Sequence, residues 1–167
     1  MDNAERRITT GRPAIDITED DNNVYVAEWV IPKGYTKEYG IERRRIVWEM
    51  YEVWKAENPS GKRYNKAVDG DIVVDENSIS ETAKHAYNDY KNVLAFYCLD
   101  KVLSNSTKFK TDPPISNRQK KMVKGGYMQI MIANLPIEPH FRKVKMIVGV
   151  TLKKDRTMYS VTALGIE

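Results

Sequence analysis

The last part of the chain, residues 143–165, alternates apolar and polar side chains on both sides of a break at Lys154 and Asp155. Because side chains along a strand point alternately to opposite faces, this pattern predicts two antiparallel strands joined by a turn. Lys-Asp is not a favoured two-residue turn, so a longer loop with a bulge is the alternative connection. A slip of one residue would destroy the apolar face, so this hairpin strongly constrains the fold. That face carries Met146, Val148, Val150, Tyr159, Val161 and Ala163, with Val148 opposite Val161 and Met146 opposite Ala163.

The opposite face of the predicted hairpin mixes lysine, hydroxyl, glycine and apolar side chains. Such a face is neither a core nor an ordinary solvated surface, and a lysine beside hydroxyls can bind an anion such as a phosphate. We therefore expect this face to be open to solvent or to a ligand. Its residues are Lys145, Ile147, Gly149, Thr151, Met158, Ser160, Thr162 and Leu164, with Lys145 opposite Leu164 and Ile147 opposite Thr162.

A long amphipathic helix is predicted over residues 78–105. Ser78 and Glu81 form a capping-box pattern at its start. Apolar residues then recur at steps of three and four, as they do along one face of a helix. We expect this stripe to pack on the apolar face of the hairpin. The stripe consists of Ile79, Ala83, Ala86, Tyr90, Val93 and Tyr97.

Upstream of that helix the sequence predicts a smaller unit over residues 23–77. It combines a strand at 23–31, a helix at 41–57 and a short strand at 69–76. The polar residues 1–22 are expected to form a flexible N-terminal arm. The buried stripe of the 41–57 helix is predicted to be Val47, Met50, Tyr51 and Trp54.

Two further segments complete the prediction. Residues 106–126 are basic, contain Pro-Pro and lack periodicity, which is typical of a long, mobile loop. Residues 127–135 predict a strand. Since helices precede a run of three strands, the chain is expected to be α+β, with one domain at 23–167 and its core at 78–167.

Charge is distributed unevenly along the chain. Residues 1–100 hold 14 Lys/Arg and 19 Asp/Glu, whereas residues 101–167 hold 13 Lys/Arg and 4 Asp/Glu. The positive potential is therefore concentrated in the last 67 residues, around the predicted sheet. Such a potential attracts polyanions and speeds their association, so nucleic acid is one candidate partner, while basic loops that only aid solubility are the other reading.

Several classes of site have no signature in this sequence. It contains no phosphate-binding loop of the GxxxxGK type and no dinucleotide-binding GxGxxG turn. Two histidines and one cysteine, Cys98, do not match the usual zinc sites and exclude an internal disulfide. No apolar run is long enough to cross a bilayer, and no signal peptide is apparent. We therefore expect no cofactor, no metal and no membrane contact.

Candidate catalytic residues lie on the long helix and on the hairpin. His85 is suited to general acid–base chemistry near neutral pH, although a boundary histidine bonded to a loop is the alternative. Lys145 could stabilise charge on a phosphate, and the hydroxyls of Ser160 and Thr162 could bind its oxygens. The alternative is that Lys145 lies on a solvated face and that both hydroxyl residues are ordinary strand residues. Cleavage of RNA by its own 2′-hydroxyl needs only a base, a proton donor and cations, so this set permits such a reaction.

The segments "SISETAKHA" (78–86) and "KVKMIVGVTLKKDRTMYSVTA" (143–163) carry a family resemblance. Over roughly residues 24–164 the chain resembles an uncharacterised family of gut bacteria, their phages and mobile elements. The same segments are similar to phage-borne nuclease domains of the barnase, EndoU, colicin and RelE-like group. This resemblance implies a helix laid on an antiparallel sheet, RNA as the target, often transfer RNA, and a toxin-like ribonuclease activity without metal.

The resemblance also implies particular site residues and surroundings. It assigns His85, Lys145, Tyr159, Ser160 and Thr162 to the catalytic set, although the predicted register turns Tyr159 toward the core. It implies a protein located in the cytoplasm of a bacterial host or in a virion, with an immunity protein or a phage structural protein as partner. Nucleic-acid contacts are expected from the basic residues Lys84, Lys120, Lys121, Lys124, Arg142 and Lys143.

Two departures from the family pattern keep a second hypothesis open. Asn92 and Val93 stand where the family has a Ser-Thr pair, and Met146-Ile147 stand where it has Leu-Thr. The chain is therefore either a metal-independent endoribonuclease or a non-catalytic relative that binds nucleic acid or protein. The sequence does not indicate the oligomeric state.

Overall fold

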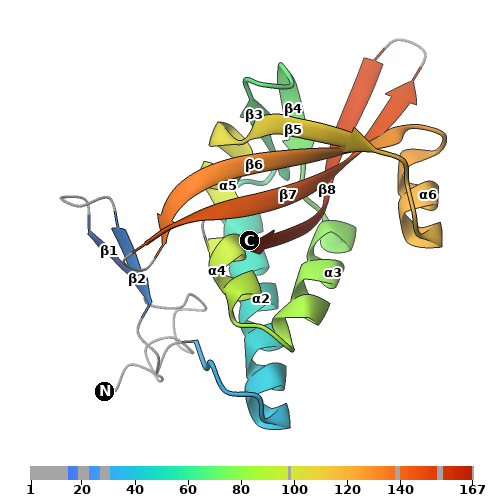
Figure 1. Cartoon of the computed structure of the whole chain (residues 1–167). Coiled ribbons are helices and arrows are strands. Elements are labelled where there is room, and N and C mark those ends of the chain that lie inside the picture. The colour runs from blue at the N-terminus through green and yellow to red at the C-terminus, as the bar shows by residue number, and fades with distance from the viewer. Residues whose placement is uncertain are drawn as a thin grey trace.

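The computed structural model describes two short segments near the N-terminus and nearly all of the chain from residue 31 onward (Figure 1). Cys98 and the turn residues Lys154 and Asp155 lie outside the described residues. The described residues are 15–18, 23–26, 31–97, 99–137, 140–153 and 156–166, with the backbone alone at 15–18, 23–26, 97, 135–137 and 140–142.

Helices and strands alternate irregularly along this part of the chain. The helices are α2 (Lys37–Glu57), α3 (Glu76–Ala86), α4 (Lys91–Tyr97), α5 (Leu99–Asn105) and α6 (Asn117–Val123). The strands are β1 (Ile15–Thr18), β2 (Asn23–Val26), β3 (Lys62–Asn65), β4 (Gly70–Val73), β5 (Thr107–Asp112), β6 (Tyr127–Ile137), β7 (His140–Lys153) and β8 (Arg156–Ile166).

The described strands form one mixed sheet in the order β1-β2-β6-β7-β8-β4-β3, with β5 also pairing β6. The pairs β5–β6, β6–β7 and β7–β8 are antiparallel, whereas β2 pairs β6 and β4 pairs β8 in parallel. The α+β class is therefore confirmed, with the predicted antiparallel sheet at its centre. β3 was not predicted, and β1 falls within the range expected to be an arm.

One hydrophobic core lies between the sheet and helices α2, α3, α4 and α5. Figure 1 shows α2, α3 and α4 together on one side of the long strands β6, β7 and β8. Helix α6 lies apart from them, at the right of the view. All four stripe residues predicted for α2 are buried, which confirms that helix. Val148 and Val161 are fully buried in the same cluster, as the predicted apolar face requires.

The hairpin of β7 and β8 follows the predicted register only near its turn. Val148 lies opposite Val161, and pairing continues as far as Lys153 and Arg156. Beyond Val148 the register shifts, so that Ile147 lies opposite Ala163 rather than Thr162. Thr162 is the extra residue of this bulge, and its Oγ1 donates to the carbonyl of Ile147 at 3.0 Å.

The bulge exchanges the faces of the residues that follow it. Leu164, predicted on the outer face opposite Lys145, instead joins the core and lies opposite Met146. Ala163, predicted opposite Met146 on the core face, lies opposite Ile147, and Lys145 lies opposite Gly165. The three pairings predicted for Lys145, Met146 and Ile147 were therefore wrong, because a single inserted residue reverses every side chain beyond it.

The helix predicted over 78–105 is three helices, α3, α4 and α5. Its start was also misplaced: Asp75 is the N-cap, its carboxylate accepts from the Ser78 amide at 3.1 Å, and Ser78 Oγ accepts from the Asp75 amide at 3.0 Å. After Ala86 the chain turns, and Asp89 caps the next segment by accepting from the Lys91 amide at 2.9 Å. The helix therefore breaks where an Asx cap competes with its continuation.

Arg43 of α2 supplies the tertiary reason for that break. Its side chain is 1% exposed, and its guanidinium donates to the carbonyls of Ala86 and Tyr87, each at 2.7 Å. It also donates to the carbonyls of Pro32 and Gly34 at 2.7 Å. The carbonyls at the end of α3 thus accept hydrogen bonds from a buried cation. This is favourable because the C-terminal end of a helix carries a partial negative charge.

The segment 106–126, expected to be a long loop, instead contains β5 and α6. β5 is exposed along almost its whole length, so its residues carry no apolar alternation that would reveal a strand. Ser116 caps α6 by accepting from the Gln119 amide at 3.0 Å. With seven residues, α6 is too short to show a helical stripe.

Candidate anion-binding cleft

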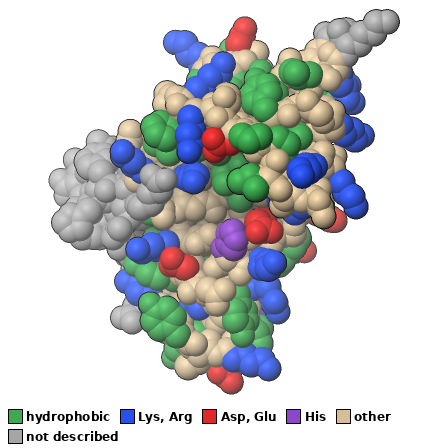
Figure 2. All heavy atoms as spheres, turned by 45° about the vertical axis from the view of Figure 1, so that its right-hand side comes forward, with side chains coloured by type: hydrophobic (Ala, Val, Ile, Leu, Met, Phe, Trp, Pro, Cys, Tyr) green, Lys and Arg blue, Asp and Glu red, His purple; other side chains and the backbone are tan. Residues whose placement is uncertain are grey.

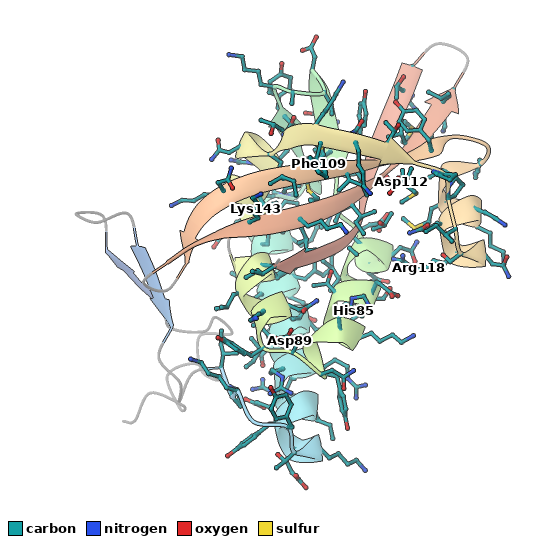
Figure 3. The ribbon with its side chains drawn as sticks, viewed as in Figure 1. His85, Asp89, Phe109, Asp112, Arg118 and Lys143 are labelled. Atoms are coloured by element: carbon teal, nitrogen blue, oxygen red, sulfur yellow. The ribbon has the colours of Figure 1, made fainter. Side chains whose placement is uncertain are left out.

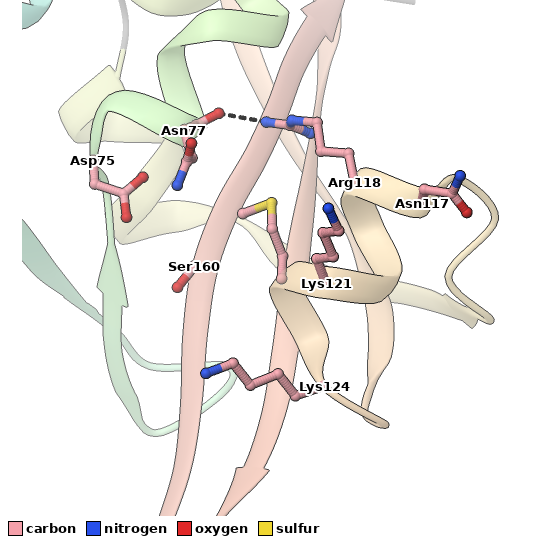
Figure 4. A pocket seen from close by; sticks show the side chains of 8 residues that line it. Asp75, Asn77, Asn117, Arg118, Lys121, Lys124 and Ser160 are labelled. Carbon is pink, nitrogen blue, oxygen red and sulfur yellow. Dashed lines mark hydrogen bonds between the residues drawn. The ribbon is translucent and has the colours of Figure 1, made fainter.

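A cleft of about 590 Å³ lies where the beginning of α3, the helix α6 and the strand β8 meet (Figure 4). These three elements are distant in sequence, so the cleft depends on the tertiary fold. Most of its lining side chains are polar or charged. They are Asp75, Asn77, Asn117, Arg118, Lys121, Met122, Lys124 and Ser160.

Close packing holds α6 against the outer face of the sheet. Val123 is fully buried, and its Cγ1 would lie 3.1 Å from a Cβ on Gly149 of β7. The hydroxyl of Thr151 donates to the carbonyl of Met122 at 3.1 Å and so holds the end of α6. At Gly126 a Cβ would lie 1.8 Å from the carbonyl oxygen of Val150, so only glycine permits this approach.

Arg118 connects all three walls of the cleft. From α6 its Nη2 donates to the backbone carbonyl of Asn77 in α3, a contact drawn in Figure 4. The same nitrogen donates to the carbonyl of Thr162 in β8 at 3.2 Å. Since both acceptors are neutral, the positive charge of Arg118 remains available to an anion in the cleft.

The cleft carries a net positive charge. Arg118, Lys121 and Lys124 line it, and among the described residues none of them forms an ion pair with a carboxylate. The one carboxylate in the lining, Asp75, is the N-cap of α3 and accepts from the amide and hydroxyl of Ser78. On the face shown in Figure 2, Lys and Arg side chains gather along the right-hand edge with few acidic ones among them. This cleft can therefore hold an anion by charge and by hydrogen bonds.

Three of the predicted site residues meet in the cleft: Ser160, Lys121 and Lys124. Lys120 is exposed on α6 but is not part of the lining. Thr162 lies beneath α6 at 1% exposure, and its hydroxyl is bonded to Ile147, so the structure does not place this hydroxyl in the cleft with that of Ser160.

Tyr159 lies on the other face of β8, half-buried against the hydrophobic core. Burial raises the pKa of its hydroxyl above the usual value, and the nearby Tyr127 and Asp69 raise the pKa further. This position agrees with the predicted register, which turned Tyr159 toward the core. The structure therefore separates Tyr159 from Ser160 by the thickness of the sheet.

His85 is exposed near the end of α3, whose first turn lines the cleft (Figure 3). Its Nε2 lies 3.2 Å from Oε1 of Glu81, one turn earlier on the helix. A histidine paired with a carboxylate in this way has a preferred ring orientation and can exchange a proton with a ligand. His85 is not itself part of the cleft lining.

The remaining predicted residues are dispersed over the surface. Lys84 is exposed on α3, Lys143 is exposed on β7, and Lys145 is half-buried on the same strand. The side chain of Arg142 lies outside the described residues. Of the predicted residues whose side chains the structure describes, Lys121, Lys124 and Ser160 line the cleft, whereas Lys84, Lys120, Lys143 and Lys145 do not.

Sequence reasoning missed Arg118, Asn77 and Asn117 in the cleft. The signal for α6 was present, because Ser116 followed by Asn117–Val123 matches a helix N-cap before helix-forming residues. For Arg118 and Asn77 no local signal exists, since 41 residues separate them.

In the part of the chain that the structure describes, no three His, Cys, Asp or Glu side chains are grouped as they would be to bind a metal ion. None of the described helices combines the length and the apolar character needed to span a membrane. Comparisons of the chain with protein-family models, with curated proteins and with solved structures gave no match.

Proposed function

We propose that this chain binds RNA by holding backbone phosphates in the cleft between α3, α6 and β8. The observation that carries the proposal is the convergence of Arg118, Lys121 and Lys124 with the Ser160 hydroxyl around one cavity. Guanidinium and ammonium groups neutralise phosphates, and hydroxyl and amide groups complete their hydrogen bonds. The excess of 13 Lys/Arg over 4 Asp/Glu in residues 101–167 would draw a polyanion toward this part of the molecule.

Neighbouring lysines on α6 provide a matched test of this proposal. Lys121 lines the cleft, whereas Lys120 is exposed on the same helix and does not. Lys121→Glu and Lys120→Glu change the net charge equally, so only the position of the charge differs. We expect Lys121→Glu to weaken binding of a fluorescein-labelled single-stranded RNA about tenfold or more, and Lys120→Glu to weaken it less than about threefold.

Fluorescence anisotropy at several salt concentrations gives the affinity of each variant for RNA and the dependence of that affinity on salt. The logarithm of affinity should fall linearly with the logarithm of salt concentration, with a slope of about −0.7 for each phosphate neutralised. Lys121→Glu should make that slope shallower by about one phosphate. Equal effects of the two substitutions would show that the overall charge, and not the cleft, attracts RNA. Absence of binding by the parent protein would overturn the proposal.

The pair formed by Glu81 and His85 favours a second candidate function, metal-independent cleavage of the bound RNA. In that reaction a 2′-hydroxyl loses its proton to a base and attacks the adjacent phosphorus. The bond to the 5′-oxygen breaks, this oxygen receives a proton, and a 2′,3′-cyclic phosphate remains. His85 would transfer the protons, while Ser160 would interact with the phosphate oxygens. Lys145 does not line the cleft that holds Ser160. Thr162 and Tyr159 take no part, because one hydroxyl is bonded to Ile147 and the other lies on the core side.

The cleavage hypothesis has its own test. Labelled transfer RNA incubated with the protein and EDTA should yield fragments that end in cyclic phosphate, and His85→Ala should abolish them. His140→Ala is the chemically matched control, since it removes the second of the two histidines of the chain. Intact RNA between pH 5 and about pH 9 would leave binding as the function, without cleavage. Origin in a phage or mobile element, and an immunity or structural protein as partner, stay predictions from the resemblance.

A further inference from the structure

Strand β5 presents an exposed aromatic side chain between two lysines. Phe109 is 67% exposed, and Lys108 and Lys110 on either side of it are exposed as well. β5 pairs with β6 on one side, and no other described strand pairs with it. Figure 3 shows Phe109 on this strand, with β6 and β7 beside it, and Figure 2 shows hydrophobic side chains exposed among lysine and arginine side chains in the upper half of its face.

A bulge turns Phe109 out of the regular pairing. Lys108 lies opposite Met131 and Lys110 lies opposite Ile130, so Phe109 has no partner on β6. Bulges redirect a side chain and bend the strand that carries them. Lys110 lies 3.6 Å from Asp112, whereas within the described residues Lys108 has no carboxylate partner. The aromatic ring is thus displayed beside at least one cation that is free to meet an anion.

These features oppose the pairing of a further strand with β5. Lysines on an edge strand and a bulge within it are the devices by which proteins prevent edge-to-edge association. A face with an exposed ring and flanking cations suits single-stranded nucleic acid instead, whose bases stack on aromatic rings while cations contact the phosphates. The chain also leads directly from β5 to α6, which carries the cations of the cleft.

We propose that Phe109 is a stacking platform for an unpaired nucleobase of the RNA whose phosphates occupy the cleft. This inference rests on the proposed RNA binding and narrows its substrate class, because a base within a duplex cannot offer its face to Phe109. Lys108 and Lys110 contact the phosphates on either side of the stacked base. The ligand is therefore RNA with a single-stranded segment, such as a loop or a free end.

The test compares three variants on two forms of one RNA sequence. Phe109→Leu keeps an apolar side chain without an aromatic face, Phe109→Trp keeps the aromatic face, and Leu152→Ala removes another exposed apolar side chain, which is 59% exposed on β7. Phe109→Leu should weaken binding of the single strand about five- to hundredfold. Phe109→Trp and Leu152→Ala should stay within about threefold of the parent. Binding of the duplex should change little in every variant.

Four outcomes would overturn the stacking proposal: unchanged single-strand binding by Phe109→Leu, an equal loss for the duplex, failure of Phe109→Trp to retain affinity, or an equal loss in Leu152→Ala. If Phe109 served a protein partner instead, Phe109→Leu would leave RNA affinity unchanged. If Lys121→Glu weakens binding while Phe109→Leu does not, the stacking proposal is wrong and phosphate binding in the cleft is retained. Thermal melting followed by circular dichroism confirms that each variant is folded, as the exposure of both positions predicts.

Discussion

The guanidinium of Arg118 donates to the backbone carbonyl of Asn77, 41 residues earlier in the chain, and thereby joins α6 to the start of α3. The same group reaches Thr162 of β8, at the bulge. One side chain therefore both builds the cleft and contributes to its charge. Together with buried Val123 and the bond from Thr151 to Met122, this contact positions α6 and its cations Lys121 and Lys124.

Arg118→Ala should loosen α6 without unfolding the protein. Two hydrogen bonds to main-chain carbonyls are lost from a partly exposed group, which costs about 1–2 kcal/mol. Hydrogen–deuterium exchange should rise within 117–124 and change little in α2, and RNA affinity should fall more than in Lys121→Glu. Exchange in α6 equal to that of the parent would show that Val123 alone fixes this helix.

Arg43→Ala should destabilise the whole fold by about 3–5 kcal/mol, because four carbonyls lose a buried donor. Arg45 on the same helix provides the control. It is paired with Glu42 and Glu49 near the surface, so Arg45→Ala should cost less than about 1 kcal/mol. Urea unfolding measures both values, and similar losses in the two variants would contradict the structural role of Arg43.

The contrast between these two arginines shows what the sequence could predict. The apolar faces of α2 and of the hairpin could be predicted, because buried residues recur with the period of the helix or strand. Arg43 lies in a run of three arginines, and nothing local marks it as the buried one. The break after Ala86 and the bulge at Thr162 depend on contacts between distant residues. A prediction from periodicity alone therefore continued the helix past Ala86 and kept a regular register past Val148. The sequence named Ser160, Lys121 and Lys124 as site residues but did not predict that they line one cleft with Arg118.

Gly126→Ala should disrupt the entry into β6. The added methyl group would lie 1.8 Å from the carbonyl oxygen of Val150, so either α6 or β7 must shift, at a cost of about 2–4 kcal/mol. Gly165→Ala is the matched control, since its methyl group would meet no atom within 4 Å, and it should change the unfolding free energy by less than about 0.5 kcal/mol. Equal stability of the two variants in urea would be inconsistent with the packing of β6 on β7.

Tyr159→Phe should alter the dependence of stability on pH in alkaline solution. Burial raises the pKa of the Tyr159 hydroxyl above its usual 10.0, so the unfolded chain loses this proton at a lower pH than the folded protein. The resulting stabilisation is complete below pH 10 and is lost as the pH rises through the folded pKa. Urea unfolding at several pH values from 8 upward should show that the free energy of unfolding falls less in Tyr159→Phe than in the parent. An equal dependence on pH in the two proteins would show that the Tyr159 hydroxyl is solvated in the folded state.

The most direct measurement of the central claim is a titration of ¹⁵N-labelled protein with a short single-stranded RNA, followed by the amide resonances. If the cleft holds the phosphates, the largest shifts should occur at Asn77, Arg118, Lys121, Lys124 and Ser160, and they should diminish as salt is added. Shifts confined to other surfaces, with these five amides unmoved at saturation, would contradict the assignment of the cleft as the nucleic-acid site.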